Sequence, residues 1–173
     1  GGLAGFFDYG HLGVLLKRNF ENLWRSFFLG LDGNFAEIES SEIMPEKVFI
    51  ASGHLKNFND FASKCKKGHI ERADHLLEKN LKQRFEGLTS EQLFEKIKEN
   101  KILCSVCGSQ IESVDVVNMM FPLQLGFGNS AKAFLRPETA QSPYVNFKVQ
   151  SGVMRKKLPL GLALIGRAYR NEL

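Results

Sequence analysis

Residues 161–173 read "GLALIGRAYRNEL", an apolar run that changes abruptly into charged and polar side chains. The pattern predicts a strand over 158–172 that is buried at first and ends in "RNE". Side chains two residues apart on a strand point to the same face, so Arg170 and Glu172 would project together. A guanidinium suits phosphate oxygens, and a carboxylate can accept from an adenine amino group. The pair therefore indicates either a nucleotide site or, more commonly for an isolated Arg-x-Glu, a surface ion pair.

A second stretch, "FLRPETAQ" at residues 134–141, repeats this arrangement. Arg136 and Glu138 lie two residues apart after an apolar run, with Pro137 between them. A single instance would again usually be a surface pair. Two such strand ends, both opening onto polar residues, favour a shared charged cleft.

Composition indicates a folded, cytoplasmic protein. Of the 173 residues, 43% are hydrophobic and 24% are charged, which supports a core and argues against a disordered chain. The net charge of +4 weakly favours an anionic partner such as a nucleotide or RNA. Three cysteines without a secretory segment favour reduced thiols over a disulfide framework. The most apolar stretch, 158–165, is far shorter than the ~20 residues of a membrane helix, so we expect no membrane association.

The hydrophobic pattern predicts a core that is interrupted by an insertion. Apolar residues at helical spacing predict a helix over 12–28, and alternation in "FAEIES" predicts a strand at 35–40. The later segments "VDVVNMMF" and "AKAFLRPE" also read as strands. Between these parts, residues 59–113 have a different character. We therefore divide the chain into 1–58, an insertion at 59–113 and a second core part at 114–173.

The insertion is expected to have a small core of its own. Its segment "RADHLLEKNLKQRFEG" predicts a helix that ends at Gly87. Thr89 and Gln92 have the spacing of a capping box, which predicts the start of a second helix. The pair "CSVC" follows this second helix.

Five segments, taken in order, resemble one enzyme family. They are "GFFDYGHLGVLLKRNFENLW", "ASGHLKNFNDF", "RADHLLE", "LRPETAQ" and "LPLGLALIGRAYRNE". Together they resemble the glycyl-tRNA synthetases of the archaeal and eukaryotic type, which are class II aminoacyl-tRNA synthetases. The resemblance extends from Gly5 to Glu172, and "RPETAQ" followed by "RNE" is specific to that family.

The resemblance implies an α+β fold, the antiparallel sheet of class II synthetases flanked by helices, with a small knuckle-like insertion. The helix at 12–28, the strand at 35–40 and Pro45 resemble motif 1, which builds the homodimer interface in this class. The segment "GRAYRNE" resembles the first half of motif 2. Residues 1–58 and 114–173 would then be two parts of a catalytic core, the second ending inside motif 2.

The resemblance also implies a reaction and its residues. Such an enzyme activates glycine with ATP to glycyl-adenylate and transfers it to the 3′ end of tRNA(Gly), while Mg²⁺ neutralises the triphosphate. Arg170 would be catalytic and bind the ATP α-phosphate, within the ATP-binding triplet Arg170, Asn171 and Glu172. Arg72 and Glu138 would bind glycine, whose ammonium group needs a carboxylate.

Two positions depart from the family pattern. His11 stands where the family usually has proline. Ser142 and Pro143 stand where it usually has glycine and an aliphatic residue. Proline costs about 3 kcal/mol inside a helix unless it lies in the first turn. We therefore expect a kink at Pro143, or a helix that starts well after Pro137.

The resemblance leads us to expect that the chain is the N-terminal half of a catalytic domain. The family's motif 3 and anticodon-binding domain would then lie beyond Leu173. We therefore expect the chain to be inactive alone. One alternative is a catalytically inactive RNA-binding paralogue, which the basic charge allows but which leaves Arg170 and Glu172 without a purpose. Another alternative is a structural zinc module, which accounts for residues 60–112 and leaves the flanks unexplained.

The three cysteines predict a structural zinc site. Cys104 and Cys107 have the spacing of a zinc knuckle, with Gly108 next for the tight turn. Related synthetases often carry a second Cys-x2-Cys near Cys65, but here the fourth position is Gly68, which cannot bind a metal, and His69 follows. We therefore expect the ligands to be Cys65, His69, Cys104 and Cys107. The alternative is a decayed site whose cysteines are simply small buried residues.

Overall fold

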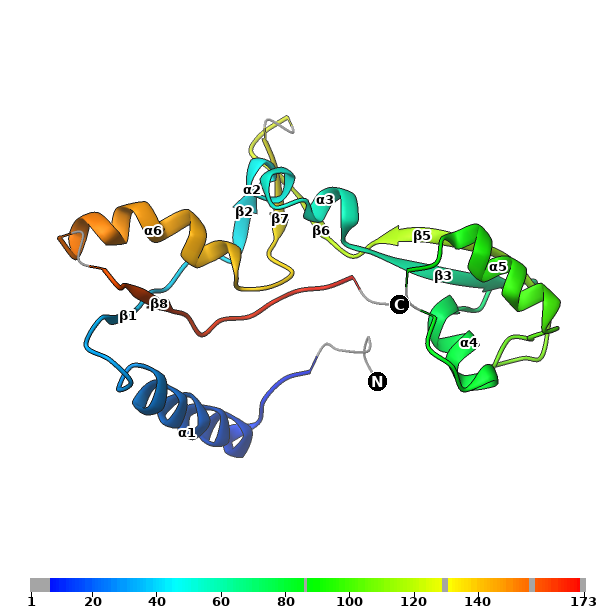
Figure 1. The fold of residues 1–173 in the computed structure, drawn as a ribbon, viewed down its shortest axis with the longest axis horizontal. Helices are drawn as coiled ribbons and strands as arrows, with labels where there is room; N and C mark the ends of the chain where they lie inside the picture. Colours follow the sequence, from blue (N-terminus) through cyan, green and yellow to red (C-terminus); the bar gives the residue numbers. More distant parts are fainter. Residues whose placement is uncertain (1–6, 86, 129–130, 156–157, 172–173) are drawn as a thin grey trace. The chain divides into compact units, whose positions relative to one another are not determined.

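The computed structural model of the protein describes residues 7–85, 87–128, 131–155 and 158–171 (Figure 1). In this part of the chain, helices and strands follow one another without a regular alternation, and the fold is α+β. The helices are α1 (His11–Phe28), α2 (Glu46–Ala51), α3 (His54–Asn57), α4 (Ala73–Leu81), α5 (Ser90–Glu99) and α6 (Gln141–Val153). The strands are β1 (Phe35–Glu37), β2 (Ile43–Pro45), β3 (Asn59–Cys65), β4 (Ile70–Arg72), β5 (Ile111–Asn118), β6 (Phe121–Leu125), β7 (Ala131–Leu135) and β8 (Gly161–Ala163).

The chain divides into two compact units. One contains residues 1–42 and 138–168, and the other contains residues 43–137 and 169–173. Each unit is therefore built from two stretches that are separated in the sequence. None of the helices in the described ranges has both the length and the apolar composition needed to cross a membrane.

The first unit contains α1, β1, α6 and β8. Strands β1 and β8 pair in parallel, with Phe35 opposite Gly161 and Glu37 opposite Ala163. This pairing favours glycine at position 161, because a Cβ atom there would lie 2.5 Å from the Phe35 ring and would force the ring to move. Arg25 of α1 donates from Nε to both carboxylate oxygens of Glu37, at 2.8 and 3.0 Å, which ties the helix to the strand.

Helix α1 confirms the helix predicted over 12–28. All of its residues are described, and none of them is buried. The apolar side chains recur at helical spacing and form one exposed face, which we call the α1 face. Its main members, each between 60% and 72% exposed, are Leu12, Leu16, Phe20, Leu23 and Phe27.

The described residues of the second unit form two three-stranded antiparallel sheets. In one sheet, β7 lies between β2 and β6, with Phe134 opposite both Met44 and Pro122. Buried Met44, Phe49 and Met120 form a small core at this sheet. In the other sheet, β3 lies between β4 and β5.

The sheet of β3, β4 and β5 carries a larger core. Helix α4 packs against β3 and β4, and α5 packs against β5 and α4 (Figure 1). The buried residues of this core are Cys65, Ala73, Leu76, Leu77, Leu93, Ile97, Ile102, Cys104 and Ile111. All of them fall within 65–111, so this stretch packs largely on its own side chains.

The two helices of this core show one confirmed and one corrected prediction. The capping box of α5 is confirmed: Thr89 Oγ1 accepts from the Gln92 backbone N–H at 3.3 Å, and Gln92 Oε1 accepts from the Thr89 N–H at 3.0 Å. Helix α4 ends at Leu81, so the predicted end at Gly87 is wrong. The helix stops because Lys82 adopts a left-handed conformation with φ of 52°.

The strand predicted over 158–172 is also wrong in its extent. Strand β8 comprises only Gly161–Ala163, and residues 164–171 lie outside any strand. The strand is short because its partner β1 is only three residues long, where a strand was predicted over 35–40. The pairing closes with a hydrogen bond from the Ile38 N–H to the Ala163 carbonyl at 2.9 Å. Strand β7 likewise ends at Leu135, before Arg136.

Helix α6 accommodates the unusual Ser142-Pro143 pair by its starting point. The helix begins at Gln141, so Pro143 lies in its first turn. Backbone N–H groups in the first turn have no partner within the helix, and proline is tolerated there. The predicted late start of this helix is confirmed.

Candidate functional site

The segment that carries Arg170 is held by backbone hydrogen bonds although it is not part of a strand. The Tyr169 N–H donates to the Arg136 carbonyl, and the Asn171 N–H donates to the Met119 carbonyl, both at 2.9 Å. Arg136 directly follows β7, and Met119 directly follows β5. Residues 169–171 therefore lie beside the ends of two strands that come much earlier in the chain.

The side chain of Arg170 is fixed on two sides. Its Nε donates to the Pro137 carbonyl at 3.2 Å, and its guanidinium carbon lies 5.3 Å from the centroid of the Phe58 ring. A guanidinium held in this way has fewer conformations to lose when it binds an anion. Asn171 is exposed, and the predicted Glu172 lies outside the described residues.

Arg136 differs from Arg170 in its surroundings. Its side chain is only 2% exposed, so it does not form the exposed surface pair that was one interpretation of "RPE". The buried Arg136 instead supports the Tyr169 backbone through its carbonyl. Of the arginines in the two similar motifs, Arg170 is exposed and Arg136 is buried.

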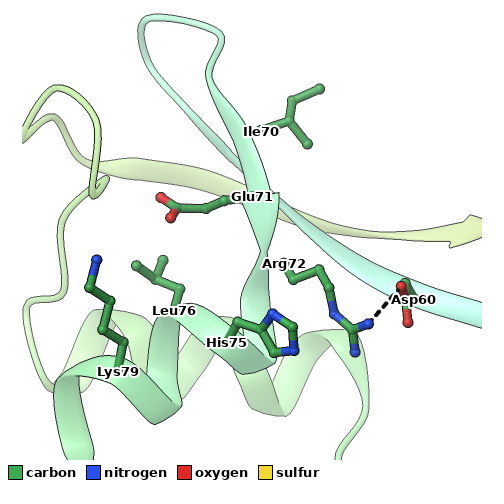
Figure 2. A pocket seen from close by; sticks show the side chains of 7 residues that line it. All are labelled: Asp60, Ile70, Glu71, Arg72, His75, Leu76 and Lys79. Atoms are coloured by element: carbon green, nitrogen blue, oxygen red, sulfur yellow. Dashed lines mark ion pairs between the residues drawn. The ribbon is translucent and has the colours of Figure 1, made fainter. Parts of the chain in front are cut away.

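Arg72 lies at the junction of β4 and α4 and is held by two carboxylates. Its Nη1 lies 3.0 Å from Asp60 Oδ2, and its Nε and Nη2 donate to the two oxygens of Asp74 at 3.1 and 2.6 Å. Figure 2 shows Arg72 reaching towards Asp60 of β3, whereas Glu71 points away on the other side of the strand. Arg72 and Asp60 line an open hollow of about 410 Å³, to which His75 and Lys79 of α4 also contribute.

Electrostatics keep Asp74 ionised. Partial burial tends to raise its pKa, but the hydrogen bonds from Arg72 and from the His75 backbone outweigh burial and hold the pKa below its ordinary value. Asp60 is only 7% exposed. The Arg72 side chain is therefore oriented by two anions on neighbouring elements.

Glu138 lies in the bend before α6, in the first unit. The buried Gln141 donates from Nε2 to Glu138 Oε1 at 2.8 Å, which orients the carboxylate. Among the described residues, Gln141 Oε1 is buried without a hydrogen-bond partner. An acceptor in this state suits a ligand that donates hydrogen bonds.

Cys65, His69, Cys104 and Cys107 come together at one end of the β3 sheet, and we call them the thiol–imidazole cluster. One ligand atom from each of the four lies within 4.8 Å of all the others. The Cys65 and Cys107 sulfurs are 3.8 Å apart. His69 Nδ1 lies 3.6 Å from Cys65 Sγ and 3.9 Å from Cys104 Sγ.

The surroundings of the thiol–imidazole cluster favour the thiolate form at Cys65 and Cys107. The Ser109 hydroxyl, 3.0 Å from Cys107 Sγ, is the main cause of a lowered pKa at Cys107. The same hydroxyl is the main influence that lowers the pKa of Cys65 to about 6. Burial raises the pKa of Cys104, and hydrogen bonds with Cys107 and Cys65 raise that of His69. Thiolate is the form of cysteine that binds metals.

Sequence analysis missed the residues that hold the predicted ones in place. Phe58 lies against Arg170, Asp60 pairs with Arg72, and Gln141 orients Glu138. A local signal existed only for Gln141, three residues after Glu138 and one helical turn away. Phe58 and Asp60 come near their arginines through tertiary folding alone, so no spacing rule could have found them.

Comparison with known proteins identifies relatives along the whole chain. No protein-family model matches it. The glycine–tRNA ligase of Methanococcus maripaludis is 46% identical over 175 residues. The glycine–tRNA ligases of Methanothrix thermoacetophila and Pyrococcus furiosus are 47% and 46% identical, each over 174 residues.

The three alignments agree in their extent. Each covers 100% of this chain and 30% of the relative, so the chain spans less than a third of the length of these ligases. The resemblance to glycyl-tRNA synthetases that the sequence motifs predicted is confirmed. From end to end, the chain is homologous to one part of the glycine–tRNA ligases.

Proposed function

We propose that the chain is part of the catalytic domain of a glycine–tRNA ligase. The enzyme would use ATP to convert glycine to glycyl-adenylate and would then transfer the glycyl group to the 3′ end of tRNA(Gly). The observation that carries this proposal is the 46–47% identity to three glycine–tRNA ligases over the full chain. The α+β fold, with its antiparallel sheets, is compatible with the class II synthetase fold that the proposal requires.

Arg170 is proposed to bind the α-phosphate of ATP. The contacts with the Pro137 carbonyl and the Phe58 ring support this role, because they hold the guanidinium in place before a ligand arrives. A preorganised cation stabilises the negative charge that grows on the phosphate in the transition state. Asn171 and Glu172 complete the proposed ATP-binding triplet, and Mg²⁺ would accompany ATP as its counterion.

Glu138 and Arg72 are proposed to bind glycine. The Glu138 carboxylate is oriented by Gln141, whose second side-chain atom Oε1 is a buried acceptor without a partner among the described residues. Two acceptors of this kind suit the three N–H donors of an ammonium group. Arg72 is oriented by Asp60 and Asp74, and an arginine held in this way suits a role in positioning a ligand.

No protein nucleophile enters the proposed reaction. The glycine carboxylate attacks the α-phosphorus of ATP, the bond from that phosphorus to the bridging oxygen breaks, and pyrophosphate leaves. The ribose hydroxyl of the tRNA then attacks the glycyl carbonyl and AMP leaves. The protein contributes positioning and charge stabilisation, which are the terms that fixed arginines and carboxylates supply.

A homodimer through α1 is proposed as the assembly. The α1 face is apolar and exposed, with Leu16 the most exposed of its main members at 72%. Contiguous apolar surface of this kind marks interaction sites in soluble proteins. A second copy of the same helix offers a matching apolar face, as a two-fold interface requires.

A grafted enzyme tests the proposed function. This chain replaces the homologous segment of the Methanococcus maripaludis glycine–tRNA ligase, and the folded product is assayed for glycine-dependent pyrophosphate exchange and for glycyl-tRNA formation. We expect both activities with glycine and neither with alanine. A grafted enzyme that folds and binds tRNA but forms no adenylate would support the inactive RNA-binding alternative and contradict the proposal.

A further inference from the structure

We propose that Cys65, Cys104, Cys107 and Nδ1 of His69 bind one structural zinc ion, and that Glu71 positions the turn that carries two of these cysteines. The inference goes beyond the proposed ligase function and does not depend on it, because the ligase chemistry uses none of these four ligands. It rests on the geometry, the donor chemistry and the hydrogen bonds of the thiol–imidazole cluster.

The distances in the cluster match those around a tetrahedral zinc ion. With Zn–S of about 2.3 Å and Zn–N of about 2.0 Å, tetrahedral angles place two sulfurs about 3.8 Å apart and a sulfur and a nitrogen about 3.6 Å apart. The Cys65 and Cys107 sulfurs are 3.8 Å apart. Nδ1 of His69 lies 3.6 Å from Cys65 Sγ and 3.9 Å from Cys104 Sγ.

The contacts of His69 select the nitrogen that binds the metal. The atom that approaches the sulfurs of Cys65 and Cys104 is Nδ1 in both cases. The glycine at position 68 cannot contribute a ligand, so the imidazole supplies the fourth donor in place of a fourth thiolate. Nδ1 is the ring nitrogen nearer the backbone, which suits a histidine that follows the first cysteine by four residues.

The donor set favours zinc over the hard cations. Three thiolates and one imidazole are soft and borderline ligands, which exclude Mg²⁺ and Ca²⁺. Four protein ligands leave no open position for a substrate, as in structural zinc sites. A disulfide is the competing explanation, but its sulfurs would be bonded at about 2.05 Å, and those of Cys65 and Cys107 are 3.8 Å apart.

Two glycine turns bring the ligands together. Gly68 and Gly108 have φ angles of 82° and 68°, which side chains rarely adopt. In the first turn, the Gly68 N–H donates to the Cys65 carbonyl at 2.8 Å, and the Cys65 N–H donates to the His69 carbonyl at 3.0 Å. In the second turn, the Gly108 N–H donates to the Cys104 carbonyl at 2.9 Å. Each turn therefore presents two ligands from a rigid backbone.

Glu71 fastens the second turn to strand β4. Its carboxylate accepts from the Ser105 backbone N–H at 3.1 Å and from the Ser105 hydroxyl at 2.6 Å. Ser105 lies directly after Cys104, so this clamp fixes the turn beside the strand that follows His69. Removing a hydrogen bond that orients a metal ligand in this indirect way typically lowers metal affinity by about 10- to 100-fold.

The ion would connect the two turns and close the core of residues 65–111. Cys65 and Cys104 are themselves buried members of that core, so the metal would be bonded directly to the packed interior. Because the ligands are assembled only in the folded chain, the free energy of zinc binding would stabilise the fold.

Metal analysis of the purified 173-residue chain tests the proposal. The chain is prepared under reducing conditions and desalted, and we expect about one zinc ion per chain, as four protein ligands hold structural zinc tightly. Replacement of zinc by Co²⁺ should give the visible spectrum of a tetrahedral site with thiolate ligands. His69→Ala should lose most of the metal, whereas the matched histidine variant His75→Ala should keep it.

A second pair of variants keeps the test decisive if His69→Ala fails to fold. His69→Cys should bind one zinc ion, with a Co²⁺ spectrum shifted towards that of four thiolates. Glu71→Ala should lower zinc affinity about 10- to 100-fold in competition with a chelator while leaving the Co²⁺ spectrum unchanged, because it removes a positioning residue and not a ligand.

Three results would overturn the inference. One is less than about a tenth of a zinc ion per folded chain, where a structural site predicts full occupancy. Another is a disulfide between Cys65 and Cys107 in the protein as purified under reducing conditions. The third is a His69→Ala variant that keeps its zinc and an unchanged Co²⁺ spectrum.

Discussion

Helices α1 and α5 carry similar sequence patterns and have opposite surroundings. Both helices are amphipathic. Helix α1 was predicted from apolar residues at helical spacing, and α5 was predicted from its capping box. Helix α5 buries Leu93 and Ile97 at 0% and 2% exposure. Helix α1, described along its full length, buries none of its residues, and Leu16 is 72% exposed.

The difference shows what an amphipathic pattern does and does not specify. The pattern determines which side chains share a face, and this was correct for both helices. It does not determine what covers that face. For α5 the cover is α4 and β5 of the same unit, whereas for α1 we propose a second copy of the chain. Substitutions in the two helices test this difference.

The largest effect on stability is expected in α5. Leu93→Ala leaves a cavity in the core of residues 65–111 and should lower the free energy of unfolding by about 3 kcal/mol. Leu16→Ala removes the same atoms from the α1 face and should change the stability of the monomer by less than about 0.5 kcal/mol. Urea unfolding of both variants at a concentration that favours monomers measures the difference. Equal losses for the two leucines would contradict the contrast.

The next largest effect is expected on self-association through α1. Leu23→Asp places a charge on the α1 face and should weaken the homodimer by about 2 kcal/mol, as expected for a central apolar anchor. Asn22→Asp is the matched control, because it introduces the same charge one residue away, about 100° around the helix from Leu23. Sedimentation equilibrium gives both dissociation constants. A homodimer that Leu23→Asp leaves intact would exclude α1 as its interface.

The smallest effect concerns the first turns of the two helices. Thr89→Ala removes the cap of α5 and should cost about 1 kcal/mol. Helix α1 begins after Gly10, whose extended backbone has open space where a Cβ would lie. Gly10→Asp should therefore add a cap and stabilise α1 by a few tenths of a kcal/mol. Hydrogen exchange of the first-turn amides detects both changes, and slower exchange after Thr89→Ala would contradict the capping box.

Local patterns in the sequence predicted local structure well. The capping box at Thr89 and Gln92 and the helix over 12–28 are confirmed, because both depend on residues within a few turns of one another. Strand β8 was predicted too long, because its length depends on the three residues that β1 offers. The end of α4 at Lys82 depends on a single left-handed residue, which no propensity of lysine indicates.

In the candidate sites, too, features set by local sequence were predicted, whereas features set by tertiary contacts were not. The thiol–imidazole cluster was found from the spacing of its cysteines, and the structure brings all four predicted residues within ligand distance. The neighbours of Arg170 and Arg72 were not found, because Phe58 and Asp60 reach them only through the folding of β3 and the segments beside it. The roles of Arg170, Arg72 and Glu138 remain predictions from the family resemblance.

The most direct test of the proposed ligase function is the effect of Arg170→Ala on glycine-dependent pyrophosphate exchange in the grafted enzyme. Arg155→Ala is the control, because it removes an exposed arginine that is not one of the proposed site residues. Loss of a preorganised cation should lower kcat/KM for ATP about 100-fold or more, with the fold retained and the control unchanged. Exchange by Arg170→Ala within about tenfold of the unaltered grafted enzyme would contradict the assignment, because a phosphate-binding arginine contributes more than this.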